Sequence, residues 1–286
     1  ALSGLAEPLM HHRFPEFLDR VREVAPHALI SIDTNASLLT EEIAERLVAA
    51  RLDSLVFSLD GVDAALVDGI RQGGSLDAVI TNIRMLSDVK QRLGSDLPTL
   101  GATFVAQRKN VAQLPDVVRL AASLSVRTLS VNGLEPYEAR LADEALWVNP
   151  SRDTEATMAA VGEAGRVAEE SGIELRLPSP VPLDARCTHV GRPIILADGT
   201  VVPCSVLAYR RERHLLIDEE GSVRPTGALT ERIAFGNVND QPLEEIWANP
   251  AYAEFRARVL RGDFPAECAL CLMKHDVVCA NAQLTP

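Results

Sequence analysis

The sequence lacks the features that would point to a membrane, a secretory route or a nucleic-acid partner. None of its apolar runs reaches the roughly 18 residues that span a bilayer, so we expect a soluble protein. Ala1–Gly4 has neither an initiator Met nor the order of a signal peptide, which predicts a cytoplasmic product that begins upstream. A formal net charge of −12 argues against a broad nucleic-acid surface, because binding phosphates needs clustered Lys and Arg.

Cysteine is absent from residues 1–186, and five cysteines follow: Cys187, Cys204, Cys268, Cys271 and Cys279. An odd number, with two in a Cys-x-x-Cys, favours metal ligation over disulfides in a chain without a secretion signal. Four thiolates suit either a tetrahedral zinc or a [4Fe–4S] cluster. A zinc ribbon typically has two Cys-x-x-Cys pairs and this chain has one, so the spacing modestly favours iron–sulfur.

Up to about residue 180, apolar strand-like runs alternate with segments of helical period. The predicted strands are residues 27–33, 55–60, 97–105, 126–131 and 173–177. The predicted helices are residues 14–24, 41–48, 76–93, 111–124 and 151–171, with Thr40 and Ser151 as N-caps of two of them. This alternation predicts an α/β fold with a parallel sheet and right-handed crossovers. It leaves open a closed barrel, a partial barrel or an open sheet.

The pattern changes at Pro178–Pro182, where three prolines in five residues mark a linker. We therefore predict two domains, residues 1–180 and 181–286. In the second domain, Asp198-Gly199 between two short apolar runs predicts a hairpin with a type I′ turn. The other predicted elements are an irregular insertion at 210–228 and helices at 243–247 and 252–260.

The cysteine pattern resembles a known family of auxiliary-cluster domains. Cys187, eleven residues, Gly199, four residues, Cys204 and the later Cys268-x-x-Cys271 resemble the domain called SPASM, or its shorter form Twitch. The segment 235–247 is similar to that family's link between the hairpin and the last cysteines. In the family this domain follows a radical S-adenosylmethionine (radical SAM) barrel.

The first part of the chain resembles such a barrel in three short motifs. The segment 4–10 is similar to the family's Gly-Gly-Glu-Pro, Thr34-Asn35-Ala36 to its Thr-Asn-Gly, and 58–61 to its Ser-x-Asp-Gly. The resemblance implies a partial (β/α) barrel in which Glu7 binds the amino group of S-adenosylmethionine. It also implies cofactor contacts along the ribose and carboxylate from Thr34, Asn35, Ser58 and Asp60. Each sits at the end of a predicted strand, at the edge where parallel sheets bind ligands, although caps and turns use the same residue types.

The chain departs from the family pattern in three ways. The Cys-x-x-x-Cys-x-x-Cys that holds the catalytic cluster is absent, and the resemblance places it upstream of Ala1. Leu5 and Ala6 replace the glycines of the first motif. Cys279 follows Cys271 by eight positions and does not match a full SPASM domain, so four ligands fit best and Cys279 is a spare thiol, a substitute ligand or a remnant.

The resemblance implies a radical SAM oxidoreductase or maturase, in which a 5′-deoxyadenosyl radical abstracts hydrogen. It would carry an auxiliary [4Fe–4S] cluster here, with a second [4Fe–4S] cluster and S-adenosylmethionine implied. We expect it to act in peptide or protein modification or in cofactor maturation, with a peptide or protein substrate and an external electron donor. Two alternatives remain: a non-catalytic iron–sulfur electron carrier or scaffold, and a zinc-stabilised α/β binding protein.

Overall fold

A computed structural model describes most of the chain. The described residues are 1–2, 7–71, 74–134, 139–146, 150–178, 187, 189–208, 211–213, 216–217, 223–224, 228–230, 232–268 and 271. Leu5, Ala6 and Cys279 lie outside them. Internal contacts group the chain into two compact units, residues 1–132 with 153–177, and residues 133–152 with 178–286. The domain boundary at residue 180 stays a prediction, since residues 179–186 are not among those described.

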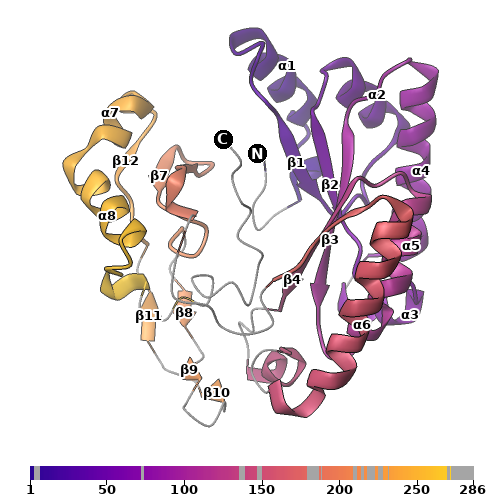
Figure 1. Cartoon of the computed structure of the whole chain (residues 1–286). Coiled ribbons are helices and arrows are strands. Elements are labelled where there is room, and N and C mark those ends of the chain that lie inside the picture. The colour runs from indigo at the N-terminus through magenta and orange to yellow at the C-terminus, as the bar shows by residue number, and fades with distance from the viewer. Residues whose placement is uncertain are drawn as a thin grey trace. The chain divides into compact units, whose positions relative to one another are not determined.

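The first unit is built on a five-stranded sheet whose order follows the chain (Figure 1). Its strands are β1 Ser31–Thr34, β2 Ser54–Ser58, β3 Thr99–Ala106, β4 Thr128–Gly133 and β5 Glu174–Arg176. The pairs β1–β2, β2–β3 and β4–β5 are parallel, and a parallel bridge joins Leu2 to Ile32. The predicted α/β partial barrel is confirmed. Among the described strands, β1 and β5 lie at the two ends of the order and do not pair with each other, so the five strands form an open sheet.

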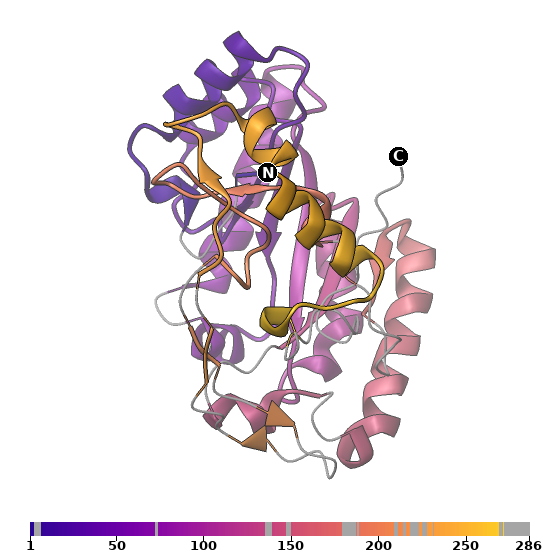
Figure 2. The ribbon, with the colours of Figure 1, turned by 90° about the vertical axis from the view of Figure 1, so that its left-hand side faces the viewer.

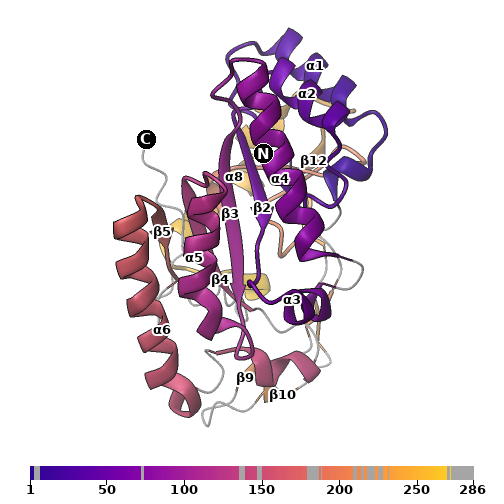
Figure 3. The same ribbon diagram turned by 90° about the vertical axis from the view of Figure 1, so that its right-hand side faces the viewer.

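The α-helices of this unit cover one face of the sheet (Figures 1 and 3). They are α1 Phe14–Val24, α2 Glu41–Ala49, α3 Ala64–Ile70, α4 Leu76–Arg92, α5 Leu114–Ser123 and α6 Pro150–Ser171. Each right-handed crossover adds the next strand on the same side, so successive helices pack against the same face. Thr40 caps α2 as predicted, its Oγ1 accepting from the Ile43 amide at 3.3 Å. The cap predicted at Ser151 is wrong, because α6 begins at Pro150, a residue suited to a first helical turn.

The two faces of the sheet differ in chemistry. Strand register places one set of residues under the helices, and all are buried: Ile32, Thr34, Leu55, Phe57, Leu100, Ala102, Phe104 and Ala106. The opposite face of β1–β3 carries short side chains, most of them polar: Ser31, Asp33, Ser54, Val56, Ser58, Thr99, Gly101, Thr103 and Val105. The fold therefore separates an apolar core from a hydroxyl-lined inner face.

Arg22, on α1, closes the amino-terminal end of the sheet. Its guanidinium donates to the carbonyls of residues 26, 28, 50 and 51, at 2.7–3.3 Å, and to Asp53 Oδ2 at 3.1 Å. Asp53 Oδ2 also accepts from the Ile30 amide at 2.8 Å. All three guanidinium nitrogens are therefore used within the fold.

The second unit places a hairpin beside two helices. β6 Ile194–Ile195 and β7 Thr200–Val202 pair antiparallel, and β7 also pairs with β12 Gly236–Asn237. Helices α7 Leu243–Ala248 and α8 Pro250–Leu260 follow each other, as the gold ribbon of Figure 2 shows. Val201, Ile246 and Tyr252 form a buried core there, with Phe235 stacked on Tyr252 at 4.2 Å between ring centroids.

Two sequence predictions for this unit are wrong. The hairpin has no two-residue type I′ turn: the Gly199 amide donates to the Leu196 carbonyl, and φ is positive at Gly199 (82°) but not at Asp198. A type I′ turn needs positive φ at both central residues. Within residues 210–228, read as irregular, lie β8 Arg211–Arg213, β9 Leu216–Ile217, β10 Val223–Arg224 and the start of β11 Ala228–Thr230. β8 pairs with β11 and β9 with β10, both antiparallel.

The described 3-10 segments are η1 Pro8–Met10, η2 Val111–Gln113, η3 Ala139–Glu144, η4 His189–Gly191 and η5 Ala266–Cys268. Within the described part of the chain, none of the helices combines the length and apolar character needed to cross a bilayer.

Candidate functional site

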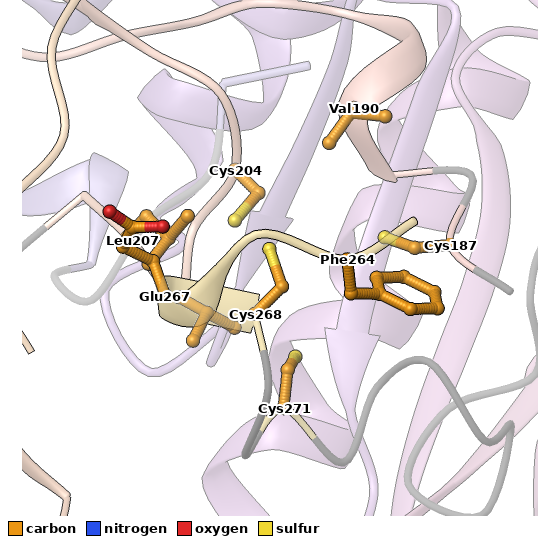
Figure 4. Close-up of a pocket in the computed structure, with 9 residues that line it drawn as sticks. Cys187, Val190, Cys204, Leu207, Phe264, Glu267, Cys268 and Cys271 are labelled. Atoms are coloured by element: carbon orange, nitrogen blue, oxygen red, sulfur yellow. The ribbon is translucent and has the colours of Figure 1, made fainter. Parts of the chain in front are cut away.

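Four cysteines of the second unit line one pocket (Figure 4). Cys204 lies two residues after β7, Cys268 ends η5, and Cys187 and Cys271 come from the segments before the hairpin and after η5. The rest of the lining is Val190, Val206, Leu207, Phe264 and Glu267. The structure thus brings together four of the five predicted ligands from segments up to 84 residues apart; Cys279 is outside the described residues.

Backbone turns hold the sulfur-bearing residues in place. The Cys268 amide donates to the Pro265 carbonyl at 2.8 Å, and the Cys271 amide donates to the Cys268 carbonyl at 3.1 Å. The amides of Val206 and Leu207 donate to the Cys204 thiol group. Such amide donors favour the charged form of a sulfur ligand, and they help to set the reduction potential of an iron–sulfur cluster.

Burial controls the charge of Cys204. It raises the pKa of this thiol to about 11, against the smaller lowering effect of the Leu207 and Val206 amides. The free thiol is therefore protonated at neutral pH, and a metal that binds its sulfur must displace the proton.

The chemistry of these donors fits an iron–sulfur cluster. No disulfide joins the four described cysteines. Among the described residues no group of three or more His, Cys, Asp or Glu side chains converges to hold a single metal ion. Four thiols around one pocket can ligate either a tetrahedral zinc or a [4Fe–4S] cluster.

Glu7, Thr34 and Asn35 come together at the carboxyl end of β1, in the first unit. Glu7 Oε1 accepts from the Thr34 hydroxyl at 2.6 Å and the Leu9 amide at 3.1 Å, and Oε2 accepts from the Asn35 amide at 2.6 Å. The Thr34 side chain lies on the helix-covered face of the sheet and is 5% exposed. Its hydroxyl therefore orients the Glu7 carboxylate from the buried side. These donors are all uncharged. Ala36 has φ of 57°, which explains why the family prefers glycine there.

Asp60 lies deeper than the resemblance implies. Its side chain is 2% exposed, with Oδ1 accepting from the Val105 amide at 2.7 Å and Oδ2 paired to Arg71 Nε at 2.6 Å. The Asn110 side chain donates from Nδ2 to the Asp60 backbone carbonyl at 3.0 Å. This burial favours the turn-residue interpretation of Asp60, and its cofactor contact stays a prediction. Ser58 is half-buried at the end of β2, on the inner face.

Sequence reasoning missed Arg71 and Gln113. Gln113 Oε1 accepts from the Val62 amide at 2.8 Å and lies 2.7 Å from where a Cβ on Gly61 would stand, so this approach requires the glycine of Ser-x-Asp-Gly. Arg71 follows Asp60 by eleven residues, a spacing that carries no short-range signal of an ion pair.

The first unit has an α/β sheet with polar residues at its carboxyl edge, and the second unit has a thiol-lined pocket. Together these features define a class of cofactor-dependent proteins. Residues 2–114 match the sequence model of the radical SAM superfamily, and residues 187–272 match that of SPASM, described as an iron–sulfur cluster-binding domain. The chain belongs to the radical SAM superfamily and carries a C-terminal SPASM domain.

Two curated relatives share parts of the sequence. One, from Pyrococcus furiosus, is a tungsten-containing aldehyde ferredoxin oxidoreductase cofactor-modifying protein; it is 26% identical over 88% of this chain and 68% of its own length. Another, mycofactocin maturase MftC of Mycobacterium tuberculosis, is 31% identical over 46% of this chain and 32% of its own length. The chain thus spans about two thirds of the first relative and one third of the second.

Solved structures share the fold. SuiB of Streptococcus suis superposes with a TM-score of 0.59 at 14% identity, over 88% of this chain and 56% of its own. The protein anSMEcpe with bound AdoMet superposes with a TM-score of 0.56 at 13% identity, over 97% of this chain and 73% of its own. At such identities the likeness shows the fold alone.

Proposed function

We propose that this protein is a radical SAM enzyme that modifies a peptide or protein or matures a cofactor. The observation that carries the proposal is that four cysteines line one pocket of a SPASM domain, in a chain whose sheet has polar side chains at its carboxyl edge. The relatives named as a maturase and a cofactor-modifying protein support both substrate classes.

Each group of residues has a distinct part in this proposal. Cys187, Cys204, Cys268 and Cys271 would hold an auxiliary [4Fe–4S] cluster. Glu7, oriented by Thr34, presents its carboxylate for the amino group of S-adenosylmethionine, with Asn35 and Ser58 beside it. Bound S-adenosylmethionine, together with a reducing cluster, supplies hydrogen abstraction. The cysteine-free residues 1–186 offer no thiolate for that second cluster.

The partners and location belong to the same proposal. A peptide or protein substrate is supported by solved relatives described with the precursor peptide SuiA and with the Kp18Cys peptide. An external electron donor and a cytoplasmic location complete it, since cysteines that form no disulfide are typical of reducing compartments.

Iron and acid-labile sulfide, measured per chain on anaerobically purified full-length protein, test the proposal. We expect about eight irons, falling to about four in Cys268→Ala/Cys271→Ala, because each [4Fe–4S] cluster carries four. Cys279→Ala is the matched control and should keep the iron if four ligands suffice. Zinc without sulfide would end the iron–sulfur interpretation.

A non-catalytic iron–sulfur protein is the second candidate, favoured by Leu5 and Ala6 in place of the motif glycines. It predicts about four irons, lost in Cys268→Ala/Cys271→Ala, and no 5′-deoxyadenosine when the reduced protein is incubated with S-adenosylmethionine. Formation of 5′-deoxyadenosine above a protein-free control would exclude it.

A further inference from the structure

Arg256, on α8, is a partly buried cation that no carboxylate neutralises among the residues that the structure describes. Its guanidinium carbon lies 3.7 Å from the centroid of the Trp247 ring and 4.5 Å from that of the Tyr252 ring. Its Nη1 is buried and has no hydrogen-bond partner within the described part of the chain. Buried charges are normally paired, because it is costly to remove them from water. The position of Arg256 therefore calls for a source of negative charge other than a neighbouring Asp or Glu.

The other two arginines at this helix are placed differently. Arg258 Nε lies 2.8 Å from Asp263 Oδ2, and Arg261 Nη2 lies 3.6 Å from Glu254 Oε1. The side chains of Arg258 and Arg261 are 38% and 62% exposed. Water and salt screen such surface pairs, so they have little effect on groups inside the protein. Arg256 differs from both, because its charge is not neutralised by a carboxylate and two rings partly shield it from water.

Tyr252 links Arg256 to the cysteine pocket. Its side chain is fully buried, and its hydroxyl donates to the Val202 carbonyl at 3.5 Å, two residues before Cys204. Burial raises the pKa of Tyr252 to about 12; the charge of Arg256 opposes this effect and that of Cys204 adds to it. Helix α8 also packs against η4, whose Val190 lines the pocket. Residues four apart share a helix face, so Arg256 lies on the face of α8 that Tyr252 turns towards Cys204.

An iron–sulfur cluster in this pocket would bring the missing negative charge. The four thiolates outweigh the positive charge of the iron–sulfur core, and each electron taken up makes the cluster more negative. A nearby cation therefore stabilises the reduced form more than the oxidised form. Net charge around a cluster is one of the factors that set its reduction potential.

We propose that Arg256 is the counter-cation of the auxiliary cluster and that its charge raises the reduction potential of that cluster. The inference rests on the proposed function, because it takes the four cysteines to hold an iron–sulfur cluster. Arg256 is not a ligand in this proposal. Trp247 and Tyr252 hold its guanidinium in place and limit its hydration, and the charge acts on the cluster across the Tyr252 ring.

Redox titration followed by electron paramagnetic resonance, on anaerobically purified full-length protein, tests the proposal. The signal of the auxiliary cluster is the one that is missing from Cys268→Ala/Cys271→Ala. Arg256→Met removes the charge and keeps an apolar chain over the Trp247 ring. We expect the ratio of reduced to oxidised auxiliary cluster at a fixed potential to fall about tenfold, which lowers the midpoint by about 59 mV for one electron.

Three further variants separate charge from packing. Arg256→Lys keeps the charge and should keep the ratio within about twofold of the wild type, although it loses the planar group that stacks on Trp247. Arg256→Gln removes the same charge as Arg256→Met with a polar side chain, and it gives the measurement if the Met variant does not assemble its cluster. Arg258→Met is the matched control: it removes one positive charge from the same helix, at an exposed pair, and should leave the midpoint unchanged.

The outcomes distinguish this inference from the proposed function. An Arg256→Met or Arg256→Gln protein that retains its iron and sulfide and has the wild-type midpoint would overturn the inference. An equal shift in Arg258→Met would also overturn it, since net charge alone would then explain the effect. A wild-type midpoint with slower reduction by a protein electron donor would make Arg256 a docking contact instead. If the wild type contains neither iron nor sulfide, the proposed function itself fails.

Discussion

An arginine lies at each end of the sheet, and the two differ in how many of their guanidinium nitrogens are hydrogen-bonded within the fold. At the amino end, Arg22 donates from every nitrogen to carbonyls and to Asp53, and its side chain is 21% exposed. At the carboxyl end, Arg71 anchors one nitrogen on buried Asp60 and keeps the other two. A saturated side chain can only stabilise the fold, whereas a half-used one is available to a ligand. The amino end of the sheet thus contributes to stability and the carboxyl end to ligand binding, as in other parallel α/β folds.

Removing Arg22 should give the largest loss of stability. Arg22→Met removes the guanidinium that donates to four carbonyls and to Asp53, so we expect the free energy of unfolding to fall by about 3 kcal/mol. Urea denaturation followed by circular dichroism measures it. The folded fraction should bind S-adenosylmethionine like the wild type; a selective loss of binding would erase the contrast between the two ends.

Asp60→Asn should cost about 2 kcal/mol of unfolding free energy. The variant keeps an acceptor for the Val105 amide but leaves Arg71 without its charged partner. Because Arg71 is partly exposed, its released guanidinium is rehydrated, and the loss stays below that of Arg22→Met. A larger loss than for Arg22→Met, in the same denaturation experiment, would contradict the division of roles.

Thr34→Val should cost about 1 kcal/mol, since the buried hydroxyl donates one hydrogen bond to Glu7 and accepts one from the Ala36 amide. Thr34→Ser keeps both bonds and is the control. We also expect weaker binding of S-adenosylmethionine in Thr34→Val, because Glu7 loses a 2.6 Å contact. Equal affinity in both variants would show that Glu7 needs no support from β1.

The smallest effect is expected in the second unit, at Asp198. Its pKa is lowered to about 2, first by the Thr200 amide, then by the Thr200 hydroxyl and then by Arg232. A lowered pKa means that the stabilisation is present above the ordinary value and is lost as pH falls through about 2. Arg232→Gln should raise the pKa only slightly, measured by NMR titration. A return to the ordinary value would show that the ion pair, not the backbone, dominates.

The sequence predicted the sheet well because its signals are periodic and local. Leu55, Val56 and Phe57 form a continuous apolar run, as in a buried parallel strand, and Thr40 stands where a helix cap is needed. The role of Asp60 was out of reach, since it depends on Val105, from a strand 45 residues away. The turn at Gly199 was mispredicted for a similar reason. A Cβ added to Gly199 would lie 2.5 Å from Asn237 Oδ1 and 2.3 Å from Asn239 Nδ2, a constraint that the dipeptide Asp198-Gly199 does not reveal. The cysteine pocket was predicted because the number and spacing of the cysteines indicate metal ligation, whatever elements form between them.

The strand order of the first unit has a consequence for how this chain is made. Each strand pairs with the one translated just before it, so the sheet can grow by addition as the polypeptide leaves the ribosome, without waiting for distant partners. β5 ends at Arg176, ahead of Cys187, Cys204, Cys268 and Cys271. These five strands can thus be paired before the four thiols of the pocket emerge.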